Sequence, residues 1–96
     1  MLLQEVKKIL SDHQKDLLQR GVRALALFGS IVRDERSPKS DVDILIDFDA
    51  KKGIFFFVNL KHYLERLLNC EVDLVTKAAL HPALKQRILK EAQHVF

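Results

Sequence analysis

The stretch LFGSIVRDERSPKSDVDILIDF, from Leu27 to Phe48, contains the features that decide the fold. A Gly-Ser pair, Gly29 and Ser30, ends one apolar run, and after ten further residues an Asp-Val-Asp sequence opens another. Residues two apart in a strand project to the same face, with their Cα atoms about 7 Å apart. Asp41 and Asp43 are therefore expected to share one face of a strand whose other face is apolar.

Hydrophobic periodicity predicts the elements around this stretch. Apolar residues recur at helical spacing over residues 3–18, and Gly21 favours a stop after them. Short apolar runs between turn residues predict strands at 23–28, 41–48 and 71–76. Helices are predicted at 30–36 with Ser30 as the N-cap, at 54–69, and at 83–95 after Pro82. The expected fold is α/β (α+β), with a three-stranded mixed sheet flanked by about four helices.

The composition fits one small domain covering residues 1–96. The chain has 96 residues, a net charge of +3 and a single cysteine, Cys70, which excludes an internal disulfide. No apolar run approaches the ~20 residues of a membrane span, and the first ten residues lack the pattern of a signal peptide. The four histidines show no metal-ligand spacing. We therefore expect a cytoplasmic protein that does not bind membranes.

A third carboxylate falls in the same strand register. In the EVDLV segment, Asp73 faces away from its apolar neighbours, so it can join Asp41 and Asp43 if the two strands are adjacent. Three carboxylates suffice to hold two Mg²⁺ ions, which prefer oxygen ligands. An isolated Asp-x-Asp is usually a solvated turn, but the preceding Gly-Ser pair and Asp73 favour a metal site here.

The Gly-Ser pair is typical of a phosphate-binding turn. Gly29 lets an anion approach the backbone, and Ser30 offers a hydroxyl and the amides of a following helical turn. Arg33, one turn later, is interpreted either as a phosphate ligand or as the partner of Asp34 or Glu35 in a salt bridge.

This pattern resembles the signature of the DNA polymerase β-like nucleotidyltransferase superfamily: a GS pair, ten further residues, and then DVD. The segments LFGSIVR, SDVDILIDF, VDLVTKAAL and ILKEA resemble its minimal nucleotidyltransferases, the small partners of HEPN-domain proteins in toxin–antitoxin pairs. The resemblance places Gly29 and Ser30 at the phosphates and Asp41, Asp43 and Asp73 at the catalytic metals. Asp34 departs from the family, which often has glycine there.

The resemblance implies an antitoxin that transfers AMP from ATP, with Mg²⁺, to a tyrosine of a HEPN-domain RNase toxin. Two alternatives remain open: a non-catalytic module that neutralises its partner by contact, and an enzyme that modifies a small molecule such as an aminoglycoside. The sequence lacks the aromatic or basic stripe typical of nucleic-acid binding. The consecutive Phe55, Phe56 and Phe57 predict either cover for a sheet edge or an interface, with a homo-oligomer as one option. An interface at this site is expected to lie near the metal site, because it follows the Asp41–Phe48 strand closely.

Overall fold

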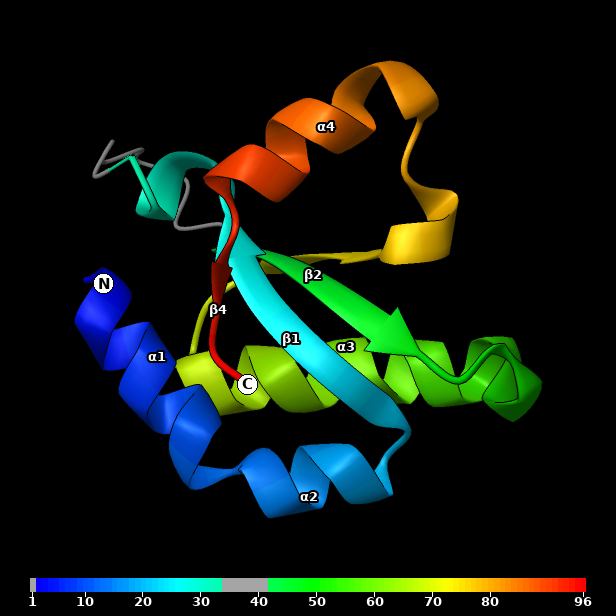
Figure 1. Ribbon diagram of the computed structural model, residues 1–96. Helices are drawn as coiled ribbons and strands as arrows, with labels where there is room; N and C mark the ends of the chain where they lie inside the picture. Colours follow the sequence, from blue (N-terminus) through cyan, green and yellow to red (C-terminus); the bar gives the residue numbers. More distant parts are fainter. Residues whose placement is uncertain (1, 34–41) are drawn as a thin grey trace.

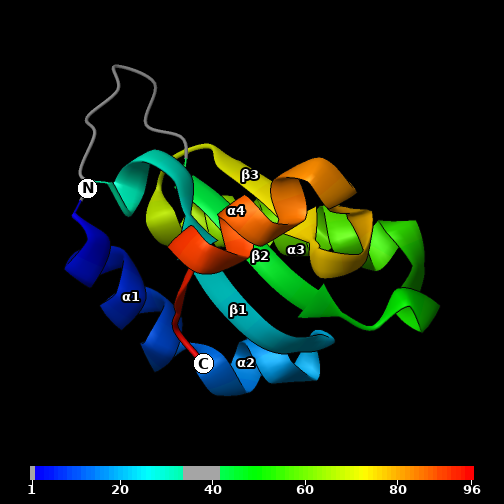
Figure 2. The same ribbon diagram turned by 45° about the horizontal axis from the view of Figure 1, so that its top comes forward.

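A four-stranded mixed sheet separates two helical layers in the computed structural model, which describes residues 2–33 and 42–96 (Figure 1). Helices α1, α2 and α3 lie on one face of the sheet, and α4 lies over the other (Figures 1 and 2). The helices are α1 (Leu3–Asp12), α2 (Gln14–Gln19), α3 (Gly53–Leu68) and α4 (Pro82–Glu91). The strands are β1 (Val22–Phe28), β2 (Val42–Phe48), β3 (Val72–Thr76) and β4 (Gln93–His94).

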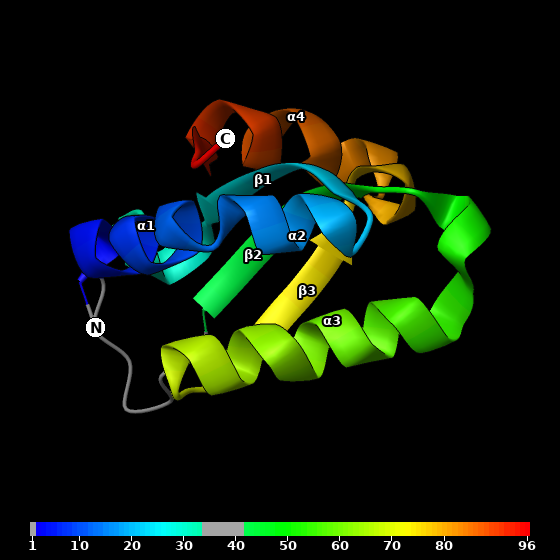
Figure 3. The ribbon, with the colours of Figure 1, turned by 90° about the horizontal axis from the view of Figure 1, so that it is seen from below.

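The strand order across the sheet is β3-β2-β1-β4. Strand β1 pairs antiparallel with β2 and β4, whereas β2 and β3 run parallel. Parallel neighbours need a long crossover, and α3 supplies it on the side of α1 and α2. As a result, β2 and β3 begin at the same end of the sheet and α3 begins at the other end (Figure 3).

The sheet has one strand more than the sequence predicts. Strand β4 is only two residues long and lies within the segment predicted to continue the last helix. Backbone hydrogen bonds fix the chain beside β1, because Val95 N donates to Leu25 O at 2.8 Å and Leu25 N donates to Phe96 O at 3.2 Å. These partners are about seventy residues apart in the sequence, and a two-residue strand has no periodicity of its own.

The core lies between the sheet and the first three helices. Alternate residues of β2 and β3 face it, as expected from the period of two in a strand, and β1 adds Leu25 and Leu27. Helix α3 adds leucines at spacings of four, so its apolar stripe faces the sheet, where the helix contacts β3. The buried core consists of Val6, Leu10, Leu17, Val22, Leu25, Leu27, Val42, Ile44, Ile46, Leu60, Leu64, Leu68, Val72 and Leu74.

Two predicted helices differ from the observed ones. The first helical segment is two helices, because the chain turns at His13, whose Nδ1 lies 2.7 Å from the carbonyl oxygen of Ile9. The segment after β1 begins as a 3-10 helix, η1 (Gly29–Ile31), with Phe28 as the residue before it. Ser30 therefore lies inside this turn and is not its N-cap. The rest of the predicted 30–36 helix runs into residues outside the described part of the chain.

A polar contact joins α2 to α3 beside the core. The hydroxyl of Tyr63 donates a hydrogen bond to Asp16 Oδ2 at 2.5 Å, and the guanidinium carbon of Arg20 lies 3.8 Å from the centre of the tyrosine ring. Burial raises the pKa of Tyr63 above 10.0, and the hydrogen bond to Asp16 raises it further. The contact therefore favours the neutral phenol.

Helix α4 lies on the outside of the fold. Pro82 stands in its first turn, and His81 Nδ1 accepts a hydrogen bond from Ala83 N at 3.2 Å. None of its residues is buried, and both Leu84 and Leu89 are exposed. Among the residues described, no helix combines the length and apolarity that crossing a bilayer requires.

Candidate active site

Asp43 and Asp73 lie opposite each other on neighbouring parallel strands. They are direct register partners in the β2–β3 pair, as the sequence predicts for adjacent strands. Their flanking residues, Val42, Ile44 and Val72, point into the core, so both carboxylates project from the face that α4 covers. Asp43 is half-buried and Asp73 is exposed. Two acidic residues therefore lie side by side on the face of the sheet that points away from the core.

Gly29 lies directly against one of these carboxylates. Phe28, which precedes Gly29 in the sequence, pairs with Asp43 in the β1–β2 register, and the chain then turns into η1. A Cβ at Gly29 would lie 2.0 Å from Asp43 Oδ2, and the φ of Gly29 is +76°. Both the lack of space and the left-handed backbone require glycine here. The structure thus gives Gly29 a role that the sequence did not reveal: it makes room for Asp43.

The turn after Gly29 is held by its own backbone. The carbonyl oxygen of Gly29 accepts hydrogen bonds from Val32 N at 3.1 Å and Arg33 N at 3.3 Å. Val32 N is the first amide that is hydrogen-bonded inside this turn. Ser30 and Ile31 precede it, in the positions where helical amides have no partner within the helix. Their amides are therefore the ones that an anion could meet, and the phosphate role of Gly29 and Ser30 stays a prediction.

Arg33 forms an ion pair with a residue far from it in the sequence. Its Nη1 donates to Oε1 of Glu91, which lies in the last turn of α4. The Arg33 side chain is 42% exposed and that of Glu91 is 18% exposed. A local salt bridge, one of the two roles predicted for Arg33, would use Asp34 or Glu35, and both lie outside the described residues. Glu91 belongs to the ILKEA segment, whose likeness to the family was the only sign of its importance.

The third predicted carboxylate, Asp41, lies outside the described residues. Within residues 2–33 and 42–96, no three Asp, Glu, His or Cys side chains gather closely enough to hold a metal ion. A three-carboxylate site would therefore need Asp41 in addition to Asp43 and Asp73. The donor set is suitable, because these two residues supply carboxylate oxygens, the ligands that Mg²⁺ prefers, from a common face.

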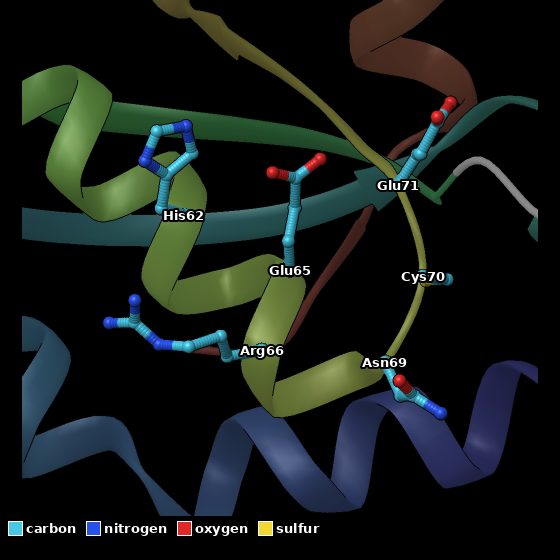
Figure 4. A pocket seen from close by; sticks show the side chains of 6 residues that line it. All are labelled: His62, Glu65, Arg66, Asn69, Cys70 and Glu71. Atoms are coloured by element: carbon cyan, nitrogen blue, oxygen red, sulfur yellow. The ribbon is translucent and has the colours of Figure 1, made fainter.

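The start of β3 is fixed by a residue of α3. Oε2 of Glu65 accepts a hydrogen bond from Val72 N at 3.1 Å, immediately before Asp73. Glu65 also lines an open cleft of about 540 Å³, together with His62, Arg66, Asn69, Cys70 and Glu71. Figure 4 shows Glu65 and Glu71 rising from different elements on this side of the molecule, with Arg66 directed away from Glu71. Glu65 is therefore a support for the strand that carries Asp73.

A family model described as "Nucleotidyltransferase domain" matches residues 3–95. The chain is 43% identical over 96 residues to the protein adenylyltransferase MntA of Thermococcus cleftensis, covering 99% of this chain and 97% of that one. A solved structure provisionally described as a minimal nucleotidyltransferase has a TM-score of 0.83 and 30% identity, covering 97% of this chain and 95% of that one. These matches confirm the resemblance seen in the sequence.

Two more distant structures share the fold alone. One is a toxin–antitoxin complex with AMP-PNP, with a TM-score of 0.71, 21% identity and coverage of 90% and 72%. The other is a tri-AMPylated HEPN toxin from Shewanella oneidensis in complex with an MNT antitoxin, with a TM-score of 0.66, 19% identity and coverage of 94% and 71%. The match of the family model over nearly the whole chain shows that this protein belongs to the nucleotidyltransferase domain family and is a nucleotidyltransferase.

Proposed function

We propose that the chain transfers AMP from ATP to a tyrosine hydroxyl of a HEPN-domain RNase toxin and acts as its antitoxin. The observation that carries this proposal is the register of Asp43 opposite Asp73, with Gly29 against Asp43. The name of the relative from Thermococcus cleftensis supports AMP transfer to a protein. The complexes with AMP-PNP and with an AMPylated HEPN toxin support ATP as the donor and a HEPN-domain protein as the acceptor.

Different residues of the chain would bind the phosphates and accept the proton. Gly29 and Ser30 would contact the β- and γ-phosphates, and Arg33 would neutralise part of their charge. A bond forms between the acceptor oxygen and the α-phosphorus as the bond to pyrophosphate breaks. The proton of the acceptor hydroxyl passes to a carboxylate oxygen of Asp73.

The carboxylates would also hold the metal. Asp41, Asp43 and Asp73 would bind Mg²⁺, with two ions expected, and the bound metal would neutralise phosphate charge and lower the pKa of the acceptor hydroxyl. Without metal, the like charges of Asp43 and Asp73 disfavour each other. Their side-by-side placement outside the core is thus better suited to binding a cation than to stabilising the sheet.

The test is to incubate the chain with ATP, Mg²⁺ and the HEPN-domain protein encoded beside it, and to measure the acceptor's intact mass. We expect the mass to rise by one or more AMP groups. Asp43→Asn and Asp73→Asn should each reduce the rate at least a hundredfold, as expected when a metal ligand is lost. Asp47→Asn is the matched control, because Asp47 lies on the same strand and face but is about 13 Å further along.

Two outcomes would contradict this function. One is full transfer by a folded Asp43→Asn variant, which would exclude the carboxylate site. The other is an unmodified HEPN-domain protein together with AMP transfer to a free aminoglycoside, which would favour an enzyme acting on small molecules.

A further inference from the structure

We infer that the exposed start of α3 is a docking surface for a partner protein whose apolar side chains are bordered by carboxylates. This α3 apolar surface consists of Ile54, Phe55, Phe56 and Val58, whose exposed fractions are 66%, 82%, 50% and 39%. Four large apolar residues within five positions of one helix are unusual on a surface that faces only water. Aromatic side chains of this kind are enriched at the centres of protein interfaces.

The core cannot use these side chains, because α3 has a single inward stripe. Phe57 belongs to that stripe and packs edge-to-face on Phe48, with 6.0 Å between ring centres. Leu60, Leu64 and Leu68 continue the stripe one turn at a time. The residues on either side of Phe57 therefore point away from the sheet. The aromatic run thus divides: one phenylalanine stabilises the fold, and two are exposed.

The border of the α3 apolar surface is cationic. Lys51 and Lys52 come directly before α3 and are exposed, and Nζ of Lys52 lies 5.3 Å from the ring centre of Phe56. The nearest acidic residue in the sequence, Asp49, is already engaged: Oδ1 lies 3.5 Å from Arg23 Nη2 and accepts from Lys51 N at 3.0 Å. Charge complementarity therefore favours a partner with carboxylates around its apolar contact.

The same charges argue against a second copy of this chain. A symmetric dimer would place the same patch of both copies face to face. The lysines of one copy would then border the lysines of the other, which costs binding energy unless anions are trapped between them. A different protein with an acidic border fits better.

The surface lies far from the candidate active site. Asp43 and Asp73 stand at the starts of β2 and β3, whereas α3 begins only after β2 has ended (Figure 3). The surface also belongs to the helical layer on the opposite face from the carboxylates (Figure 1). The expected closeness of the three phenylalanines to the metal site is thus not seen, because the length of β2 separates the two. Holding the partner and modifying it are expected to be separable functions.

The partner's identity rests on the proposed function, so the experiment uses the HEPN-domain protein encoded beside this chain. Its affinity is measured by isothermal titration for the parent chain, Phe55→Ser and Phe56→Ser. We expect at least one serine variant to weaken binding about thirtyfold, as for a hot-spot residue, with Mg²⁺-dependent ATP binding unchanged. Lys52→Glu should weaken association more at low salt than at high salt. Leu2→Ser is the control, because Leu2 is 48% exposed at the far end of the molecule.

Each outcome decides the question. Association that is lost in the phenylalanine variants but kept in Leu2→Ser supports the surface, even if no AMP is transferred, in which case only the proposed function falls. Equal affinity of all variants overturns the surface, as does absence of any binding by the parent chain. Light scattering that shows a dimer of this chain alone, dissociated by Phe55→Ser, would instead assign the surface to a second copy.

Discussion

The carboxylate of Asp43 occupies the space that a Cβ atom on residue 29 would need, so only glycine fits at Gly29. The position of a Cβ on Gly29 is 2.0 Å from Oδ2 and 2.9 Å from Cγ of Asp43, well inside the closest contact that carbon atoms tolerate. Gly29 lies in the turn directly after β1, and Asp43 lies in β2, the strand that pairs antiparallel with β1. The orientation of the Asp43 carboxylate thus depends on the absence of a side chain fourteen residues earlier.

Gly29→Ala should therefore displace Asp43. We expect a loss of ~1–3 kcal/mol in the free energy of unfolding from the positive φ, and in addition a loss of transfer activity of at least tenfold. Gly53→Ala is the control, because Gly53 has a φ of +84° and nothing within 4 Å of its Cβ position. It should lose similar stability, measured by urea denaturation, and keep its activity. Equal activity losses in the two variants would mean that strain, and not Asp43, is responsible.

Two substitutions can distinguish a direct role of Arg33 in phosphate binding from its role in the ion pair with Glu91. If Arg33 contacts a phosphate directly, Arg33→Ala should weaken ATP binding about tenfold, as expected for a charge-assisted hydrogen bond. Glu91→Gln weakens the ion pair but leaves the guanidinium, so it should change the affinity by no more than about twofold. Titration calorimetry measures both. The same loss in both variants would show that Arg33 acts by holding α4 in place.

Glu65 is expected to support Asp73 through the start of β3. Glu65→Ala removes the acceptor for Val72 N and should cost ~1 kcal/mol of unfolding free energy, with a several-fold lower transfer rate. Glu65→Gln keeps a carbonyl oxygen at nearly the same place and should restore most of both quantities. Chemical denaturation and the initial rate of transfer report them. An alanine variant with unchanged rate would limit Glu65 to a role in stability.

The contact between Tyr63 and Asp16 is expected to make the free energy of unfolding depend on pH. The pKa of Tyr63 in the folded protein lies above its unfolded value of about 10, so the contact stabilises the fold fully at pH values below 10. This contribution is lost as the pH rises through the folded pKa. Tyr63→Phe keeps the ring over which Arg20 lies and should cost ~1 kcal/mol at neutral pH. As the pH rises above about 10, the parent chain should lose part of this advantage over Tyr63→Phe; a constant difference would exclude the phenol as its source.

Much of the sheet and the placement of two of the three predicted carboxylates could be predicted because their signals are local. The alternation of apolar and acidic residues in β2 and β3 determines which face each side chain takes, so the placement of Asp43 and Asp73 on one side follows once the strands are adjacent. The leucine spacing of α3 likewise predicts its buried stripe. The role of Asp41 stays a prediction, because it lies outside the described residues.

Other features could not be predicted because they depend on partners distant in the sequence. Strand β4 forms through hydrogen bonds to β1, and Glu91 is 58 residues from Arg33. The break at His13 leaves the apolar period almost unchanged, so one helix and two fit the pattern equally well. Phe55 lies near β2 in sequence but far from Asp43 in space, because β2 carries the chain away from the site before α3 begins.

The lack of buried residues in α4 has a consequence for how the molecule fluctuates. An element with no buried residue contributes little to global cooperativity, and it can open without unfolding the sheet. Hydrogen exchange in α4 should then proceed through low-energy local openings, whereas β1 and β2 exchange only on global unfolding. Because Glu91 lies in α4, each opening would also break its ion pair with Arg33, while the strands beneath stay paired.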